Sequence, residues 1–326
     1  MKRRTFIAAL GGAAAWPVVA RAQQAAKTYK IGVLSAGIDP IHSPILAPFI
    51  AALGRLGWIE GKNFVYEIRF ANNQLDRLPN LAAELVRLNV DLIITLGTLA
   101  PLAAKKATPT IPIVMIAAGD PLGSGLVTNL ARPGGNITGL SLMSPDLGGK
   151  RLELLKEVLP SVSRVAVLWN RLNPYSASSF NEAQSAGQKL RVEIQSFGVK
   201  GPDELDEALD AIGSRHPDAL ITIEDPLTVD LRQKIVDVVT IHRVRAIYGL
   251  REFVDSGGLI AYGASLSDLF RRSAGYVDKI LKGALPGDLP VEQPTKFELV
   301  INLKAAKQID LQIPVPIVAR ADEVIE

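Results

Sequence analysis

Short apolar runs alternate along this chain with longer segments in which apolar residues recur every three or four positions. Runs of four to eight residues rich in Val, Ile and Leu are typical of buried strands. We expect strands at 30–34, 63–70, 92–96, 113–116, 165–169, 192–196, 219–223 and 259–261, and later a strand over 297–302 followed by a short helix over 303–311. Apolar spacing over 45–56 and 78–88 predicts amphipathic crossover helices. This alternation favours parallel α/β sheets.

The two halves of the chain resemble each other. Residues 30–37 are similar to 164–171, and residues 90–98 are similar to 216–224. A length of 326 residues fits two α/β domains of roughly 100 to 200 residues each. We therefore expect two doubly wound, Rossmann-like lobes, although any series of alternating strands and helices shows some self-similarity and that alternative stays open here.

Pro and Gly cluster at 131–139, 143–149, 257–258 and 283–290, where turns and crossings between lobes are least costly. We place crossings near 143, 265 and 295. The expected first lobe comprises 28–142 and 266–295, and the expected second lobe comprises 143–265 and 296–326.

The first 22 residues have the pattern of an export signal. Basic residues at 2–4 precede an apolar stretch at 6–20, and the segment ends at Ala22, after which we expect cleavage and a periplasmic location. A membrane anchor is the alternative, but the stretch is interrupted by Pro17 and is too short for a bilayer core of about 30 Å. Arg3 and Arg4 resemble a twin-arginine signal, whereas Lys2 departs from that pattern and leaves the general secretory route open.

Composition excludes several functional classes. Removing the leader's four basic residues turns the formal charge of +3 into −1, which gives no electrostatic basis for binding nucleic acid. The chain has no Cys, and its three His lack metal-binding spacing, so we expect no metal and no cofactor. Residues 147–151 and 134–139 lack the spacing of a P-loop or a dinucleotide fingerprint, and 119–125 is not a nucleophile elbow.

Polar residues follow the predicted strands. In a doubly wound sheet this edge binds ligands, because crossover helices begin there with unpaired N–H groups. The candidate ligand-binding residues at these positions, including aromatic residues that would wall a cleft, are Ser35, Ala36, Gly97, Thr98, Asp120, Pro121, Asn170, Tyr175, Glu224, Asp225, Tyr248 and Tyr262.

Two of these residues carry the sharpest expectation. Thr98 precedes an apolar helix, so its hydroxyl and the nearby N–H groups are suited to a carboxylate; the alternative is a plain helix cap. Asp225, or otherwise Asp120 or Glu224, is suited to an ammonium group; the alternative is again a cap or a solvated side chain.

Four ordered blocks, 119–127, 129–139, 251–259 and 289–304, resemble the substrate-binding proteins of ABC transporters that include the tryptophan- and tyrosine-binding type. The likeness covers nearly the whole chain after residue 30. It implies a type I periplasmic-binding fold, with three crossings between two lobes and a ligand held in the cleft between them.

The expected function is therefore that of a monomeric periplasmic binding protein. It would capture a small carboxylate ligand, an aromatic or other amino acid, and deliver it to the membrane permease of an ABC importer. Two alternatives remain: a periplasmic sensor subunit with the same fold, and a two-lobed enzyme using Asp120 and Asp225 as acid and base, for which the sequence shows no positive sign.

Overall fold

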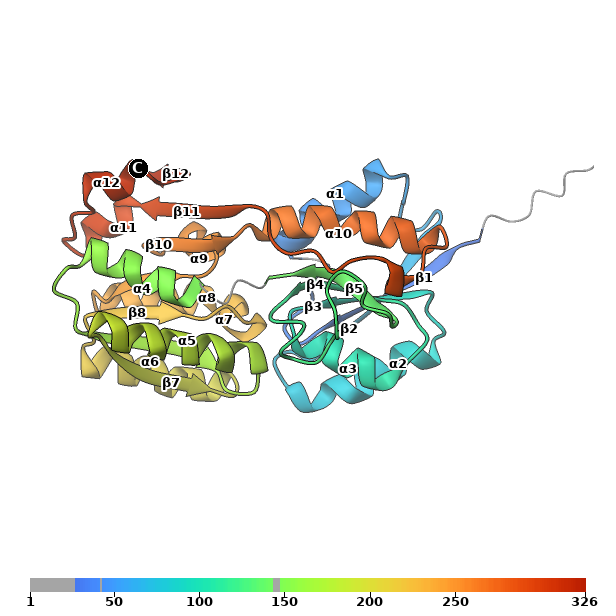
Figure 1. Ribbon diagram of the computed structural model, residues 1–326, viewed down its shortest axis with the longest axis horizontal. Helices are drawn as coiled ribbons and strands as arrows, with labels where there is room; N and C mark the ends of the chain where they lie inside the picture. The colour runs from blue at the N-terminus through green and yellow to red at the C-terminus, as the bar shows by residue number, and fades with distance from the viewer. Residues whose placement is uncertain (1–26, 42, 143–146) are drawn as a thin grey trace, which may run out of the picture.

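The computed structural model describes residues 27–41, 43–142 and 147–326. The expected leader and the expected crossing near 143 lie outside these residues. Figure 1 shows two α/β lobes side by side along the long axis of the molecule. Within the described ranges, no helix is long and apolar enough to cross a membrane.

Each lobe is built on one sheet. The first sheet is parallel throughout and has the order β2 (Phe64–Phe70), β1 (Tyr29–Ser35), β3 (Leu92–Leu96), β4 (Ile113–Ala118) and β5 (Ile137–Ser141). The second has the order β12 (Glu323–Ile325), β11 (Phe297–Asn302), β10 (Ile260–Ala264), β9 (Arg245–Tyr248), β8 (Ala219–Thr222), β6 (Arg164–Asn170) and β7 (Glu193–Val199). Within it, β11 runs antiparallel to β10.

The same strand order occurs in both lobes. The series β2-β1-β3-β4-β5 is repeated as β7-β6-β8-β9-β10, which confirms the prediction of two doubly wound lobes. The order reverses between β1 and β3 and again between β6 and β8. In open α/β sheets, ligands bind outside the carboxyl ends of the strands at such switch points.

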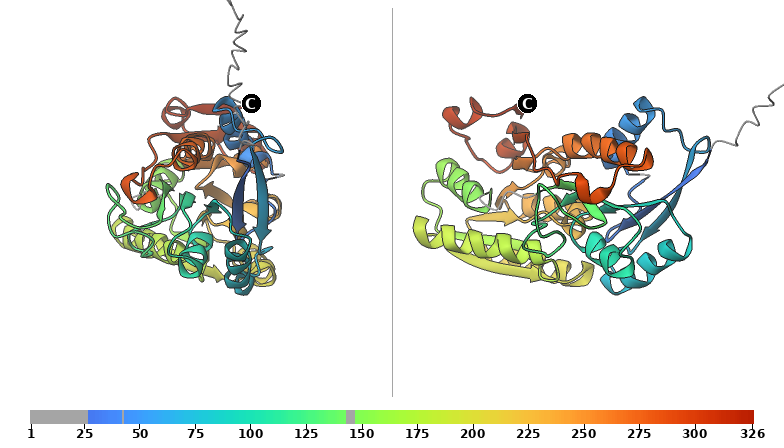
Figure 2. Two further views of the ribbon diagram at one scale, coloured as in Figure 1. Left: turned by 90° about the vertical axis from the view of Figure 1, so that its right-hand side faces the viewer. Right: turned by 45° about the vertical axis from the view of Figure 1, so that its right-hand side comes forward.

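Helices cover both faces of each sheet (Figure 2). In the first lobe, α1 (Ala47–Arg55) and α10 (Leu266–Leu281) pack on one face, and α2 (Leu78–Arg87) and α3 (Leu99–Ala107) on the other. Side chains alternate across a strand, so Ile94 of β3 packs with α1 and α10 whereas its neighbour Ile93 packs with α2 and α3. In the part of the chain that the structure describes, short 3₁₀ helices span Pro44–Leu46, Leu75–Arg77 and Pro286–Asp288.

The second lobe has the same layers. Helices α4 (Leu147–Val158), α5 (Pro174–Leu190) and α11 (Leu303–Gln308) lie on one face, and α6 (Pro202–Arg215), α8 (Arg232–Ile241) and α9 (Arg251–Asp255) on the other. The shorter α7 (Pro226–Asp230) follows β8, and α12 (Val315–Val318) precedes β12. One apolar cluster is continuous from the first lobe into this second face.

The chain passes between the lobes near α10. This helix follows β10 in sequence but packs on α1, β4 and β5 of the first lobe. The segment after it runs beside β5, where Thr138 Oγ1 donates to the Leu289 carbonyl at 2.7 Å. The chain then returns to the second sheet as β11.

Three strands differ from the sequence expectation. Strands β5, β9 and β12 were not predicted, because β5 contains Thr138, Gly139 and Ser141, while β9 and β12 have only four and three residues. The helix expected over 303–311 ends at Gln308, since Asp310 adopts a left-handed conformation with φ 54°.

Gly139 tests how closely β5 is fitted to β4. Its φ is +135°, and an added Cβ would lie 2.1 Å from the Met115 carbonyl oxygen. We expect Gly139→Ala to lower the free energy of unfolding by about 2 kcal/mol or more in urea titrations. The control is Gly54→Ala in α1, where a Cβ meets nothing within 4 Å and should stabilise by roughly 0.5–1 kcal/mol. If Gly139→Ala left the free energy of unfolding unchanged, the close packing of β5 against β4 at this residue would be contradicted.

Candidate functional site

A pocket lies between the lobes at the carboxyl ends of the switch-point strands. Its empty volume is about 850 Å³, including the opening to solvent. The first lobe contributes Ser35, Ile38, Asp39, Pro40, Ser43, Ile45, Leu96, Gly97, Thr98, Ile116, Ala117, Gly119 and Leu142, with Leu266 and Phe270 from α10. The second contributes Asn173, Tyr175, Glu224, Asp225, Pro226, Val229, Asp230, Arg232 and Leu250.

Thr98 and the start of α3 form one polar part of the first-lobe wall. Thr98 Oγ1 accepts a hydrogen bond from the Gly119 N–H at 2.9 Å, and its side chain makes no capping bond to its own helix. The alternative of a plain cap is therefore corrected. The hydroxyl retains its proton for an acceptor, and the first N–H groups of α3 have no partner within the helix.

Glu224 lines the second-lobe wall, but its carboxylate is engaged by protein groups. Arg151 of α4 donates to both carboxylate oxygens at 2.9 Å, and the Tyr175 hydroxyl donates to Oε1 at 2.8 Å. Both members of the ion pair are about 2% exposed. The expectation that Glu224 receives a ligand ammonium is corrected, because Arg151 already neutralises it.

The packing around this ion pair leaves no room for side chains. An added Cβ at Gly249 would lie 2.1 Å from Glu224 Oε2, and one at Gly263 would lie 1.8 Å from the Gly249 carbonyl oxygen. Arg151 Nε also donates to the Tyr262 carbonyl at 2.8 Å. Burial raises the pKa of Glu224, but attraction and hydrogen bonding by Arg151 outweigh it, so the net pKa is lowered.

Asp225 lines the pocket as the N-cap of α7. Its Oδ1 accepts from Asn170 Nδ2 at 3.0 Å and from the Leu227 N–H at 2.9 Å, and its Oδ2 accepts from Asn173 Nδ2 at 2.7 Å. A reciprocal bond from the Asp225 N–H to Thr228 Oγ1 completes a capping box. Burial raises the pKa of Asp225 despite these bonds.

Six of the twelve expected residues do not line the pocket. Ala36 and Pro121 are buried in the first lobe. The Asp120 carboxylate accepts from the Gly123 N–H at 2.8 Å in a local turn, so it forms no pocket pair with Asp225. Asn170 acts behind the pocket wall by holding Asp225.

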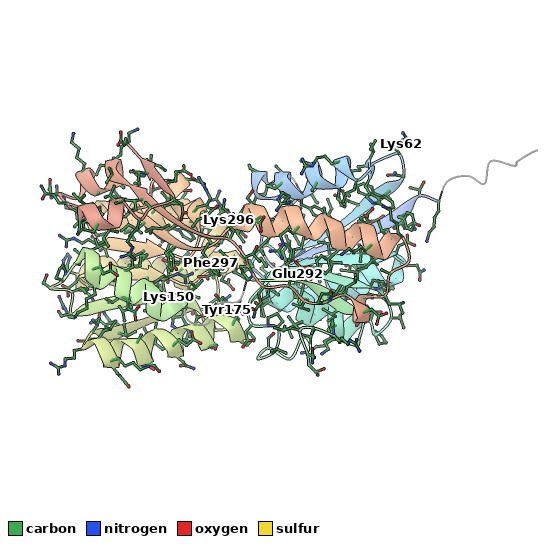
Figure 3. All side chains as sticks on the ribbon, turned by 45° about the horizontal axis from the view of Figure 1, so that its top comes forward. Lys62, Lys150, Tyr175, Glu292, Lys296 and Phe297 are labelled. Atoms are coloured by element: carbon green, nitrogen blue, oxygen red, sulfur yellow. The ribbon has the colours of Figure 1, made fainter. Side chains whose placement is uncertain are left out.

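Two expected aromatic wall residues also belong elsewhere. Tyr248 is 1% exposed and stacks on Phe253 at 4.6 Å, because β9 lies in the middle of the second sheet. Tyr262 contacts Arg151 through its carbonyl. Trp169, an aromatic residue near the end of β6, stacks on Phe180 at 4.8 Å and does not line the pocket. Tyr175 alone among the expected aromatic residues lines the pocket. It lies in the first turn of α5, and Figure 3 shows it close to the first lobe.

Sequence reasoning missed several pocket residues. Asp230 ends α7 and Phe270 lies in α10, so neither follows a strand directly. Arg151, which does not itself line the pocket, lies 73 residues from its partner Glu224, and nothing local signals that pairing.

Comparisons with known proteins agree with this architecture. The model of the family described as ABC transporter substrate binding protein matches residues 30–325. A tyrosine-binding protein of Clostridioides difficile is 29% identical over 287 residues, which are 88% of this chain and 82% of the relative.

Two solved structures are similar over nearly the whole chain. A conserved domain protein from Vibrio cholerae is 28% identical, with a TM-score of 0.85, covering 91% of this chain and all of the other. A Streptococcus pneumoniae domain in complex with L-Trp is 25% identical, with a TM-score of 0.83, covering 92% of this chain and all of the other.

The Arg151–Glu224 pair should be essential to the second lobe. Glu224→Gln leaves a buried guanidinium without its counter-charge, and we expect a loss of about 3–5 kcal/mol in urea titrations at pH 7. The control, Glu157→Gln, removes an exposed partner of Arg320 and should change little.

The loss should also depend on pH. Because the pKa of Glu224 is lowered in the folded state, its contribution is present above the unfolded value of about 4.3 and disappears as pH falls through the folded pKa. The stability difference between wild type and Glu224→Gln should therefore shrink below about pH 4. An equal difference at pH 3 and pH 7 would contradict this assignment.

Proposed function

The chain belongs to the family of ABC transporter substrate-binding proteins, and from this premise we propose that its interlobe pocket captures an amino acid with an apolar or aromatic side chain. Members of this family bind small molecules and work with the permeases of ABC transporters. The observation that carries the proposal is the pocket itself, which lies at the switch points of both lobes and is lined by polar groups from each lobe and by a set of apolar residues.

The ligand carboxylate would bind at the first-lobe wall. The Thr98 hydroxyl has a proton to donate, and the first N–H groups of α3 carry the positive end of the helix dipole. Pro101 has no N–H, so the available donors are concentrated at the first two residues of the helix, Leu99 and Ala100. This arrangement favours one small anionic group.

The ligand ammonium would bind toward the second lobe. Asp225 and Asp230 of the second lobe, with Asp39 of the first, line the pocket together with one cationic residue, Arg232, so carboxylates are in excess. Asp225 was the leading candidate from sequence, but its capping bonds leave less of its charge for a ligand. The charge of the wall as a whole therefore carries the preference for a cation.

The body of the ligand would contact an apolar surface. Its members are Ile38, Ile45, Leu96, Ile116, Leu142, Val229, Leu250, Leu266 and Phe270, with Tyr175 at one side. Aliphatic residues outnumber aromatic ones in this set, so shape and burial rather than ring stacking would hold the side chain. The tyrosine-binding relative and the L-Trp complex support an aromatic amino acid as the first ligand to test.

The remaining parts of the proposal concern the setting of this site. We infer a monomer with lobes comprising 28–142 with 266–295 and 143–265 with 296–326, which close on a hinge around the ligand without chemical conversion. It would work in the periplasm after cleavage behind Ala22 and deliver its ligand to an importer permease.

Calorimetry with three related compounds tests the two polar ends separately. We expect L-tryptophan to bind, while tryptamine, which lacks the carboxylate, and indole-3-propionate, which lacks the ammonium, bind at least about tenfold more weakly. L-Tyrosine and L-leucine compare aromatic with aliphatic bodies.

Thr98→Val removes the hydroxyl while keeping the shape of the side chain. In the same assay, it should lower the affinity for L-tryptophan by roughly ten- to a hundredfold. Thr98→Ser keeps the hydroxyl and is the matched control. The proposed orientation would be rejected if all three compounds bound with equal affinity, or if Thr98→Val bound L-tryptophan as tightly as wild type does. A melting curve of each variant shows whether a loss of affinity is caused by a loss of stability.

Replacement of Arg3 and Arg4 together by Lys tests the export route. Lysine does not reproduce the planar guanidinium pair, so the precursor of the double variant should remain inside the cell. Cell fractionation with an antibody against the mature chain gives the result. Normal export of the double variant would reject the twin-arginine route and favour general secretion.

A further inference from the structure

Three glycines of the first lobe face side chains of the second lobe. Gly97 and Gly119 follow β3 and β4, and an added Cβ would lie 3.1 Å from Pro226 Cγ and 2.1 Å from Tyr175 Cγ, respectively. The third, Gly37, follows β1. The two lobes are therefore in direct contact at the ends of three neighbouring strands.

The contact at Gly37 is polar and involves Asp230, the last residue of α7. An added Cβ at Gly37 would lie 2.1 Å from Asp230 Oδ2. The same oxygen accepts from the Ile38 N–H at 2.9 Å and from Asn73 Nδ2 at 3.2 Å. One carboxylate oxygen of the second lobe thus holds two donors of the first lobe.

The first-lobe side of this contact is held in place by its own backbone. The Asn73 N–H donates to the Ala36 carbonyl at 2.8 Å, and the Asn72 N–H donates to the Gly37 carbonyl at 2.9 Å. Asn73 has φ 61°, a left-handed conformation that Asn tolerates. The loops after β1 and β2 therefore present the two donors together.

We propose that Asp230 is a latch, a positioning residue that stabilises the closed arrangement of the lobes through Ile38 and Asn73. This proposal rests on the proposed hinge closure but not on the identity of the ligand. Because these bonds join protein groups only, the latch acts in the free protein as well, where it raises the fraction of closed molecules. Apparent ligand affinity depends on the population of the binding-competent state, so the latch also sets affinity through that population, in addition to the charge that Asp230 contributes to the pocket wall.

Interlobe distance in the ligand-free protein tests this proposal directly. The chain has no Cys, so Leu122→Cys and Leu172→Cys place two spin labels on exposed positions after β4 and β6. Native mass spectrometry first confirms that the labelled protein carries no small molecule. Double electron–electron resonance then measures the distance between the two labels, and we expect it to show a population of closed molecules. Asp230→Ala should lower the ratio of closed to open molecules by on the order of tenfold, the value of a charge-assisted hydrogen bond.

Two further variants make the test specific. Asp237→Ala removes an exposed carboxylate of α8 in the same lobe and should leave the distances unchanged. Gly37→Ala should open the protein as Asp230→Ala does, and the double variant should open no further, because both changes remove one contact.

Three results would overturn the latch. These are a single open distance in the wild type, unchanged distances in Asp230→Ala, and additive effects in the double variant. Melting curves of both single variants, matched to wild type, show that opening is not loss of fold. Since no ligand is added, failure of this experiment is distinct from failure of the amino-acid assay.

Discussion

Wherever the strand order of a parallel sheet reverses, the two connecting segments leave toward opposite faces and open a crevice at the carboxyl edge. This chain makes that reversal twice, between β1 and β3 and between β6 and β8. The two crevices face each other, so one pocket receives the ends of both sheets. The polar groups that meet there follow from this topology and not from any local catalytic motif.

The pocket needs rigid walls and a close approach of the lobes. The buried pair Arg151 and Glu224 supplies rigidity, since the bidentate contact ties α4 to the loop after β8 and holds Tyr175 by its hydroxyl. Glycines supply the approach: a Cβ at Gly119 would overlap Tyr175. Two rigid lobes that meet at glycines are suited to closing by rigid-body movement of one lobe toward the other, rather than by local rearrangement.

Much of the fold could be predicted because most strands, though not β5, β9 and β12, carry their own apolar signal. The runs at β1, β3 and β6 and the self-similarity of the halves were sufficient for two doubly wound lobes. Thr98 followed from its position after β3.

Partners distant in sequence were not predictable: Glu224 reads as a free acid until Arg151 is placed beside it. Tyr248 was misplaced because a strand-end aromatic in the middle of a sheet is buried. Asp230 acts across the lobes, which no local pattern reveals.

A crystal structure of the protein with L-tryptophan would show whether both switch points contact one ligand. We expect a ligand carboxylate within hydrogen-bond distance of Thr98 Oγ1 at the start of α3, an indole among Ile116, Leu142 and Phe270, and Asp230 still bonded to the Ile38 N–H. Density for the ligand outside this pocket, or in contact with one lobe alone in closed molecules, would contradict this expectation.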